Sequence, residues 1–441
     1  MNESKLRSSV MLRMFIVAFL TLLLLIPALI VESLVSEREH RRNSAVTEVS
    51  QKWGTGQTVT GPILTLPFKK FLKVEKGRTI SSTEFAHFLP EKLFVNAELN
   101  PEVRYRGIYE VVLYNASLTF TGVFTAPSFR EFDVALENIL WEDAFLTVGI
   151  TDLKGIKGPI SLNWNASELS VNPGVKTNDI VDVGVTANPS VNPSRTAYPF
   201  SFRVSLNGSE ELKVVPIGKE TSVTMSSKWS DPSFIGDFLP EKREIHGDSF
   251  HADWKVFDLN RNFPQRWIGS QHKLDSSAFG VKLILPVDEY HKTMRTVKYA
   301  IMFIAFTFIS LFMTEILAKT ILHPIQYTFI GLALILFYVL LLSISEQIAF
   351  SLAYLVASVS IIGIVSLYAK AITSSVRVTF MICCTLTVLY GFLYVVLQLQ
   401  DYALLLGSVG LSTVLALLMY LTRKIDWFSL AKSRITPTDA P

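Results

Sequence analysis

The sequence predicts a membrane protein of mixed α and β structure, with six transmembrane helices and one large, mainly β domain inserted between helices one and two. Two observations predict this class. The 441 residues are 49% hydrophobic and only 18% charged, whereas soluble proteins average about 25% charged residues. The charges are also unevenly placed, because 30 of the 41 bases and 31 of the 38 acids lie in residues 34–297. The chain ends are therefore hydrocarbon-like, and the middle resembles a soluble domain.

Composition also excludes two classes of protein. The formal net charge is +3, which argues against a strongly basic nucleic-acid-binding protein. A chain this apolar can bury enough surface to offset the entropy lost on ordering, which argues against disorder.

Six segments are long and apolar enough to cross a bilayer, which takes about 20 mostly apolar residues. We expect them at residues 14–33, 298–318, 325–345, 347–369, 378–400 and 402–422. The last four contain no Asp, Glu, Lys or Arg. A buried helix of a soluble core seldom stays uncharged over such a length, so these segments are interpreted as spans.

The positions of Lys and Arg near the span ends predict the orientation. The bases of the short loops and chain ends all fall on one side: Lys5, Arg7, Arg13, Lys319, Lys370, Arg377, Arg423, Lys424, Lys432 and Arg434. Residues 1–13 and 423–441 are therefore expected in the cytoplasm, and residues 34–297 outside. A cleavable signal peptide is the alternative for the first span, but its 18-residue uncharged core is long and Glu32-Ser33-Leu34 is a poor cleavage site, so an uncleaved anchor is favoured.

The segment 34–297 is expected to be mainly β, in one sandwich or two, because β-branched and aromatic runs recur between Pro, Gly and Asn turns. Only residues 36–51 have a helical pattern. The peptide Phe88-Leu89-Pro90-Glu91-Lys92 recurs 150 residues later, at residues 238–242. This repeat indicates either two similar β units or one shared type of turn. The segment has no cysteine, and Cys383 and Cys384 both lie in the fifth span.

No phosphate loop, catalytic serine motif or zinc-protease motif is present. We therefore expect that the protein binds no cofactor and no metal and is not an enzyme. His246 and His251 lie near Asp248 and Asp253, but their spacing matches no known metal-ligand pattern, so a polar loop is favoured.

Two acidic residues in the outside segment form a further candidate. Asp231 and Asp237 flank a short apolar peptide, and a hydrolase could use two carboxylates. Asp before Pro and Gly before Asp are also ordinary turn sequences, which is the favoured interpretation.

Polar residues in and beside the second and third spans are the stronger candidates. Glu315 lies inside the second span, where a charge is costly and often functional. Its alternative role is an interfacial pair with Lys319, four residues later. His323, Gln326 and Tyr327 follow in the turn before the third span and its first residues.

Five peptides and the Gly61-Pro62 segment resemble the CreD family of inner membrane proteins, also called the cell envelope integrity family. They occupy residues 229–240, 322–327, 341–346, 402–407 and 421–427. The resemblance covers nearly the whole chain, except that the C-terminal tail is short here. It implies a Gram-negative inner membrane, a periplasmic β domain, a link to envelope integrity and to a two-component regulon, and altered tolerance of colicins or β-lactams. It implies no catalytic residues.

Three functions remain open. The leading one is a non-enzymatic protein that supports envelope integrity and binds an envelope protein or lipid through the outside domain. The lipid bilayer is a further expected partner, and a homo-oligomer is also expected. The second is a small-molecule or lipid transporter formed by helices two to six, with Glu315 and the His323 turn. The third is a hydrolase that uses Asp231 and Asp237.

Overall fold

The chain forms two compact units in the computed structural model, which describes residues 10–74, 78–285, 289–318, 322–399 and 402–423. The helical unit comprises residues 1–41 and 287–441, and the β unit comprises residues 42–286. Helix α3 (Leu25–Trp53) contributes residues to both. The mixed α and β class is therefore confirmed. The expected tails 1–13 and 423–441 lie largely outside the described residues.

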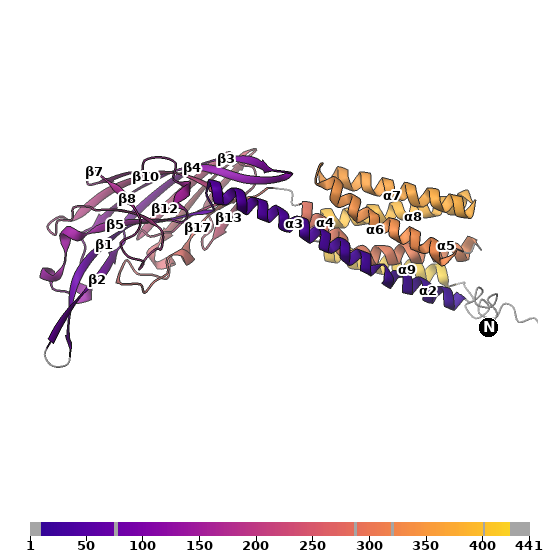
Figure 1. Cartoon of the computed structure of the whole chain (residues 1–441), viewed down its shortest axis with the longest axis horizontal. Coiled ribbons are helices and arrows are strands. Elements are labelled where there is room, and N and C mark those ends of the chain that lie inside the picture. Colours follow the sequence, from indigo (N-terminus) through magenta and orange to yellow (C-terminus); the bar gives the residue numbers. More distant parts are fainter. Residues whose placement is uncertain (1–9, 75–77, 286–288, 319–321, 400–401, 424–441) are drawn as a thin grey trace, which may run out of the picture. The chain divides into compact units, whose positions relative to one another are not determined.

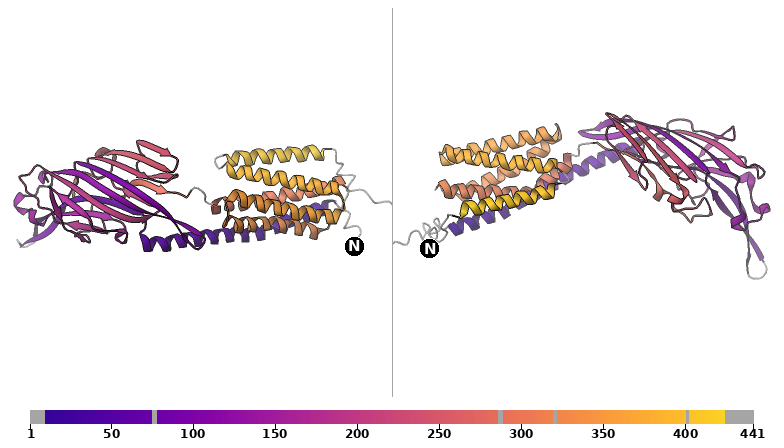
Figure 2. Two further views of the ribbon diagram at one scale, coloured as in Figure 1. Left: turned by 90° about the horizontal axis from the view of Figure 1, so that it is seen from above. Right: turned by 180° about the vertical axis from the view of Figure 1, so that it is seen from behind.

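The helical unit consists of long apolar helices that run side by side (Figures 1 and 2). Its helices besides α3 are α2 (Val10–Leu23), α4 (Glu289–Lys298), α5 (Ala300–Ala318), α6 (Pro324–Ser345), α7 (Phe350–Thr373), α8 (Val376–Gln398) and α9 (Ala403–Thr422). Each expected span coincides with one of these helices or with a consecutive pair.

Four helices among the described residues are long and apolar enough to cross a membrane, and a fifth span results if the bent pair is counted. The pair is α4 and α5, which meet at an angle of 46°. Helix α9 is helical over 20 residues, but its described apolar stretch, Leu405–Ala416, is shorter than a span. A sixth span therefore stays a prediction.

The β unit contains two sheets that share one hydrophobic core. The nine-stranded sheet has the order β13-β17-β11-β1-β5-β9-β8, with β2 paired to β1 and β16 paired to β2. Its strands are β1 (Gln57–Val74), β2 (Arg78–Phe88), β5 (Phe145–Ile150), β8 (Val171–Pro173), β9 (Gly184–Ala187), β11 (Glu211–Val214), β13 (Pro232–Gly236), β16 (Arg266–Ile268) and β17 (Phe279–Leu283).

The second sheet is eight-stranded, in the order β14-β15-β12-β3-β4-β10-β6-β7. Its strands are β3 (Lys92–Arg106), β4 (Tyr109–Thr125), β6 (Ser161–Trp164), β7 (Ser167–Leu169), β10 (Ala197–Ser209), β12 (Glu220–Ser227), β14 (Lys242–His246) and β15 (Ser249–Phe257). Burial alternates along β3, β10, β12 and β15, as expected for a sheet with one wet face.

The repeated peptide corresponds to a shared connection and not to two separate sandwiches. Each copy leaves the nine-stranded sheet and leads into a strand of the eight-stranded sheet, β3 at Lys92 and β14 at Lys242. In each copy the glutamate N–H donates to a neighbouring strand, from Glu91 to Val123 O and from Glu241 to Asp253 O. Strands from both halves of the segment occur in each sheet, so the halves form one sandwich.

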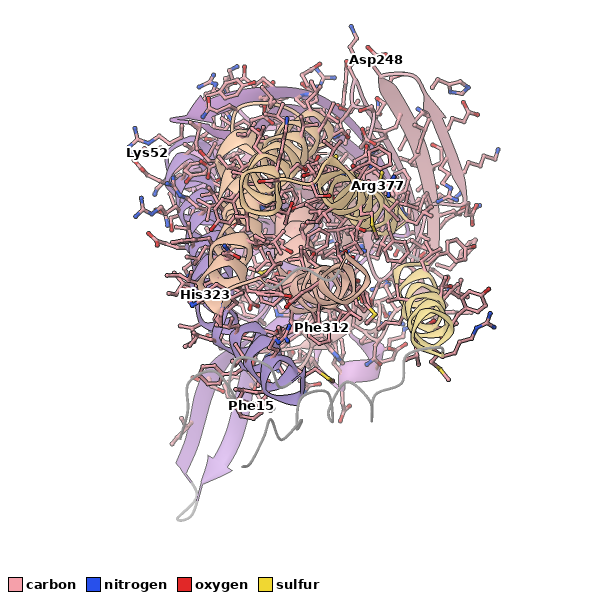
Figure 3. The ribbon with its side chains drawn as sticks, turned by 90° about the vertical axis from the view of Figure 1, so that its right-hand side faces the viewer. Phe15, Lys52, Asp248, Phe312, His323 and Arg377 are labelled. Carbon is pink, nitrogen blue, oxygen red and sulfur yellow. The ribbon has the colours of Figure 1, made fainter. Side chains whose placement is uncertain are left out.

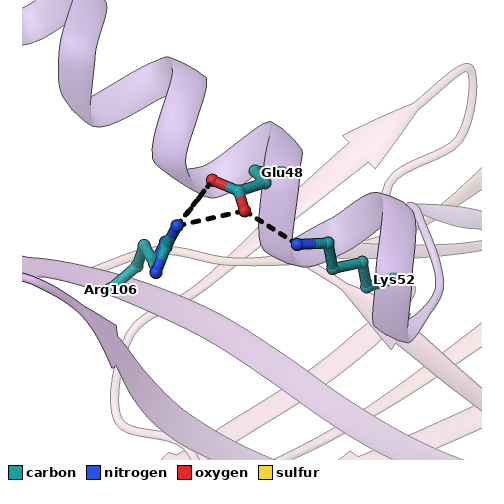
Figure 4. Close-up of polar contacts among 3 residues, drawn as sticks. All are labelled: Glu48, Lys52 and Arg106. Atoms are coloured by element: carbon teal, nitrogen blue, oxygen red, sulfur yellow. Dashed lines mark hydrogen bonds and ion pairs between the residues drawn. The ribbon is translucent and has the colours of Figure 1, made fainter.

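The last turns of α3 pack within the β unit and lead into β1. Glu48 accepts hydrogen bonds from Arg106 on β3 at 3.2 Å and from Lys52 at 2.8 Å (Figure 4). At the start of β1, the Gln57 side chain is completely buried and forms hydrogen bonds with three backbone groups. Its Nε2 donates to the carbonyls of Asp152 and Asn207, and its Oε1 accepts from the Asp152 N–H. The helical pattern expected at residues 36–51 is confirmed.

Candidate functional site

Glu315 is a charged side chain that lies buried among the membrane helices. Only 3% of this residue is exposed. Its Oε1 accepts a hydrogen bond from Arg13 Nη1 at 2.8 Å, and its Oε2 accepts one from the Tyr327 hydroxyl at 2.9 Å. Both carboxylate oxygens are therefore engaged. Pairing and hydrogen bonding of this kind offset the cost of removing a carboxylate from water.

Three helix ends bring these side chains together. Arg13 lies in the first turn of α2, Glu315 in the last turn of α5, and Tyr327 in the first turn of α6. Helix α2 contacts both α5 and α6, which places its start beside the α5–α6 connection. Figure 3 looks along the helices and labels Phe15, Phe312 and His323, which lie near these three ends. We call Arg13, Glu315 and Tyr327 the first polar clamp.

The expected partner of Glu315, Lys319, lies outside the described residues. Arg13 was not predicted as a partner, since it was used only as a marker of orientation. One signal could have found it: the Lys and Arg positions predict that the first span starts and the second span ends on the same side, which puts Arg13 and Glu315 at the same level. The Arg13 Nε is buried and has no partner within the described part of the chain.

His323 and Gln326 start helix α6. The Ile325 N–H donates to His323 Nδ1 at 3.3 Å, and the His323 N–H donates to Gln326 Oε1 at 2.9 Å. Pro324 occupies the first helical position, where its missing N–H costs nothing. This reciprocal cap satisfies backbone groups that a helix start leaves free. Of the four candidates in this region, the structure therefore joins Glu315 and Tyr327, whereas His323 and Gln326 shape the helix start.

A second clamp of the same composition lies at the other ends of the helices. Glu346, which follows α6, accepts a hydrogen bond from the Tyr290 hydroxyl at 3.0 Å. Arg38 Nη1 lies 3.8 Å from the same carboxylate, whose side chain is 11% exposed. Arg38, Tyr290 and Glu346 form the second polar clamp, which the sequence does not predict because its three members are far apart along the chain.

Both clamps hold the N-terminal helices α2 and α3. Each joins one arginine of these helices to one glutamate and one tyrosine of the remaining helices. Arg13 and Arg38 are 25 positions apart, a separation of about 37 Å at a rise of 1.5 Å per residue. A bilayer with its headgroup regions is about 40–45 Å thick. The two clamps are therefore separated along the N-terminal helices by a distance similar to the thickness of a bilayer.

The geometry of Asp231 and Asp237 does not fit a two-carboxylate hydrolase. The two residues flank the extended strand β13, so their backbones are about 20 Å apart at roughly 3.3 Å per residue. Glycosidase carboxylates, by comparison, lie about 5–10 Å apart. Asp231 accepts a hydrogen bond from the Ser230 hydroxyl, and the Asp237 N–H donates to Ala278 O. The peptide between the two acids is strand β13, paired with β17, and not the turn that the sequence favours.

The two histidines considered for a metal site lie on neighbouring strands. His246 ends β14 and His251 lies in β15, where its Nε2 is 3.5 Å from Asp253 Oδ2. Within the residues that the structure describes, no group of three or more His, Cys, Asp or Glu side chains is placed to hold a metal ion.

A buried histidine in the β unit was not predicted. His87 on β2 is completely buried, its Nδ1 lies 2.9 Å from Thr65 Oγ1, and its ring packs on Trp267. Asp179 Oδ2 lies 3.4 Å from its Nε2. Burial lowers the pKa of His87 to about 4, and Asp179 counteracts part of that effect. Thr65 is also completely buried, so this Thr-His-Asp arrangement offers a substrate no access to the hydroxyl.

Comparison with known proteins identifies a family and a relative that match nearly the whole chain. A family model described as inner membrane protein CreD matches residues 9–428. The inner membrane protein CreD of Escherichia coli is 32% identical over 422 residues, which cover 94% of this chain and 93% of that protein. An M1 zinc metallopeptidase of Deinococcus radiodurans aligns with 38% of this chain and 39% of its own at 9% identity and a TM-score of 0.19. A likeness that weak supports no argument about fold or chemistry.

Proposed function

Because the chain belongs to the CreD family of inner membrane proteins, we propose that it supports the integrity of the cell envelope without catalysis, by binding an envelope partner through its β unit. The observation that carries this proposal is the β unit itself. It has its own continuous core, and it displays large apolar side chains to solvent, among them Leu259 at 93% and Leu239 at 75% exposure. We infer that these exposed side chains contact the partner.

The proposed topology has six spans, cytoplasmic termini and a periplasmic β domain at residues 34–297, in a Gram-negative inner membrane. Two contacts support it. The first clamp joins the start of α2 to the end of α5, and the second joins α3 to the end of α6. Spans one and two must run in opposite directions for the first contact to form, as this topology requires. The first clamp also supports an uncleaved first span, because Arg13 holds α2 to α5.

Photo-crosslinking in cells tests the proposed function. A photoreactive residue at Leu259 or Leu239 should capture an envelope protein or lipid, whereas the same residue at the buried Phe120 should capture nothing. The variant that captures a partner should also restore the envelope-stress tolerance of a deletion strain. If neither exposed position yields a product while the protein is present at normal abundance, the proposal fails.

A transporter or lipid handler formed by helices two to six is the second candidate. It is favoured by the buried carboxylate of Glu315 and by the Arg13 Nε beside it, which has no partner among the described residues. Complementation by Glu315→Gln decides between the two, with membrane levels checked by immunoblot. Loss of rescue at normal abundance would place function at the first clamp. Full rescue would leave Glu315 with a structural role.

A further inference from the structure

The long strands β1 and β2 extend beyond the sheet that they belong to. Strand β5 pairs with β1 only at Val59–Thr65, and β16 pairs with β2 only at Ala86–Phe88. The β1–β2 pairing itself continues from Leu64–Phe88 out to Val74–Arg78. Past a bridge from Phe68 to Ile139, the two strands pair only with each other within the described part of the chain. Figures 1 and 2 show the resulting ribbon. We call residues 69–74 and 78–84 the β1–β2 ribbon.

The ribbon concentrates positive charge. Its 13 residues include the bases Lys69, Lys70, Lys73 and Arg78 and the single acid Glu84. The whole segment 34–297, by contrast, has 30 bases and 31 acids. Lys70 pairs with Glu84 at 3.0 Å, and Lys69 is exposed. A local excess of this size in a neutral domain attracts an anionic partner.

The ribbon also exposes apolar side chains on both of its faces. Phe71 is 53% exposed and Ile80 is 56% exposed. Phe71 lies opposite Ser81, whereas Ile80 lies opposite Leu72, the next residue along β1. Because successive residues of a strand point to opposite faces, Phe71 and Ile80 lie on different faces of the ribbon.

Apolar groups on both faces distinguish between anionic partners. An acidic protein segment or a glycan that docks on one face leaves the other apolar side chain in water. The interfacial layer of a bilayer surrounds an inserted ribbon, so that it accepts Phe71 and Ile80 together. Lysine stems pack along the apolar layer while their ammonium groups reach the lipid phosphates.

We propose that the β1–β2 ribbon docks on an anionic lipid surface, with Phe71 and Ile80 in the interfacial layer and Lys69 and Lys70 on the headgroup phosphates. This inference rests on the proposed function, since it names a lipid as a partner of the β unit. Each lysine near an anionic surface contributes about 1 kcal/mol, so the loss of two should weaken binding by about thirtyfold.

Vesicle flotation tests the inference with the full chain held in nanodiscs of phosphatidylcholine. The unaltered protein should float with added vesicles that contain phosphatidylglycerol and not with vesicles of phosphatidylcholine alone. The variants Lys69→Gln/Lys70→Gln and Phe71→Ser/Ile80→Ser should each lose binding. The matched control Lys242→Gln/Arg243→Gln removes two charges from the exposed strand β14 and should bind like the unaltered protein. Thermal unfolding of each variant shows that the β unit is intact.

Three results would overturn the inference. They are equal flotation with both kinds of vesicle, equal loss in the β14 control, and release by millimolar inorganic phosphate, which would indicate an anion site instead of a lipid surface. Failure here is distinguishable from failure of the proposed function. If the unaltered protein ignores vesicles while Leu259 still cross-links to an envelope protein, the ribbon inference falls and the proposed function stands.

Discussion

The helical unit and the β unit place their charges in opposite ways. In the helical unit the carboxylates of Glu315 and Glu346 are withdrawn from the surface, and apolar side chains such as Leu367 and Val388 are exposed. In the β unit ion pairs such as Arg106 with Glu48 and Lys219 with Glu91 are exposed, and the core is mainly apolar. Apolar helix surfaces gain little free energy by packing against one another in a bilayer, because the lipid tails are equally apolar. Directional contacts therefore specify how the helices are arranged there. In water, apolar burial stabilises the β unit, and its surface charges contribute little.

The sharpest test of this comparison removes one arginine from the first clamp. Arg13→Leu leaves the Glu315 carboxylate buried without its cation, which should cost about 3–5 kcal/mol. We expect a strong fall in thermal stability in detergent and in membrane abundance. Arg377→Leu is the matched control, because Arg377 is exposed at the start of α8.

A double variant separates a lost ion pair from general disruption. In Arg13→Leu/Glu315→Gln both charges are removed, and the amide oxygen introduced by the second substitution can still accept from the Tyr327 hydroxyl. Stability should recover in large part relative to the single variant. A double variant as unstable as Arg13→Leu would show that Arg13 does not stabilise the protein through its ion pair with Glu315.

The next largest effect is expected at the buried amide of the β unit. Gln57→Leu keeps the side-chain size but deprives the Asp152 N–H and two carbonyls of their partners. Unsatisfied buried groups cost about 1–3 kcal/mol each, with partial relief from relaxation, so we expect a loss of about 2–4 kcal/mol by chemical unfolding. Gln271→Leu, at an exposed position, should be neutral. Equal stability of the two variants would contradict the assigned role of Gln57.

Acid should destabilise the β unit through His87. The pKa of this group is lowered to about 4 in the folded chain, so the unfolded chain binds a proton first as the pH falls below about 6.5. Stability is therefore complete above that value and is lost as the pH drops toward 4. Between pH 7 and pH 5 the loss should be about 2 kcal/mol.

Two histidine variants check that dependence. His87→Gln should be less stable at pH 7 but should lose this part of the pH slope. His246→Gln, on the exposed strand β14, should keep the slope of the unaltered protein. An unchanged slope in His87→Gln would assign the acid sensitivity to other groups.

The smallest effect is expected at the surface pair on α3. The Lys52 and Arg106 side chains lower the pKa of the Glu48 carboxyl, yet all three groups are exposed (Figure 4). Solvent and salt screen such contacts. Glu48→Gln should not shift the melting temperature measurably at physiological salt. A fall in melting temperature as large as that caused by Gln57→Leu would contradict the statement that surface charges contribute little to the β unit.

The parts of the fold that follow from local composition were predictable. Hydropathy identified the helical segments because a span is a run of about 20 apolar residues and needs no knowledge of its neighbours. The recurrence of β-branched and aromatic runs between turn residues identified residues 34–297 as mainly β, because both signals are local to the chain. How the two halves of residues 34–297 combine could not be predicted in this way, because each sheet contains strands from both halves.

Two members of the first polar clamp, Glu315 and Tyr327, were predicted as candidates, whereas their partner Arg13 was not. The sequence by itself determined that Glu315 is a costly charge inside an apolar helix, and that Asp231 and Asp237 flank a short apolar peptide. Tertiary structure decided which groups offset that cost: Arg13 is 302 residues away along the chain, and its contact depends on how α2 packs against α5 and α6. It also decided that His87 is buried beside Asp179. Burial and ion pairing depend on residues that are close in space, whereas composition and periodicity depend only on residues that are close along the chain.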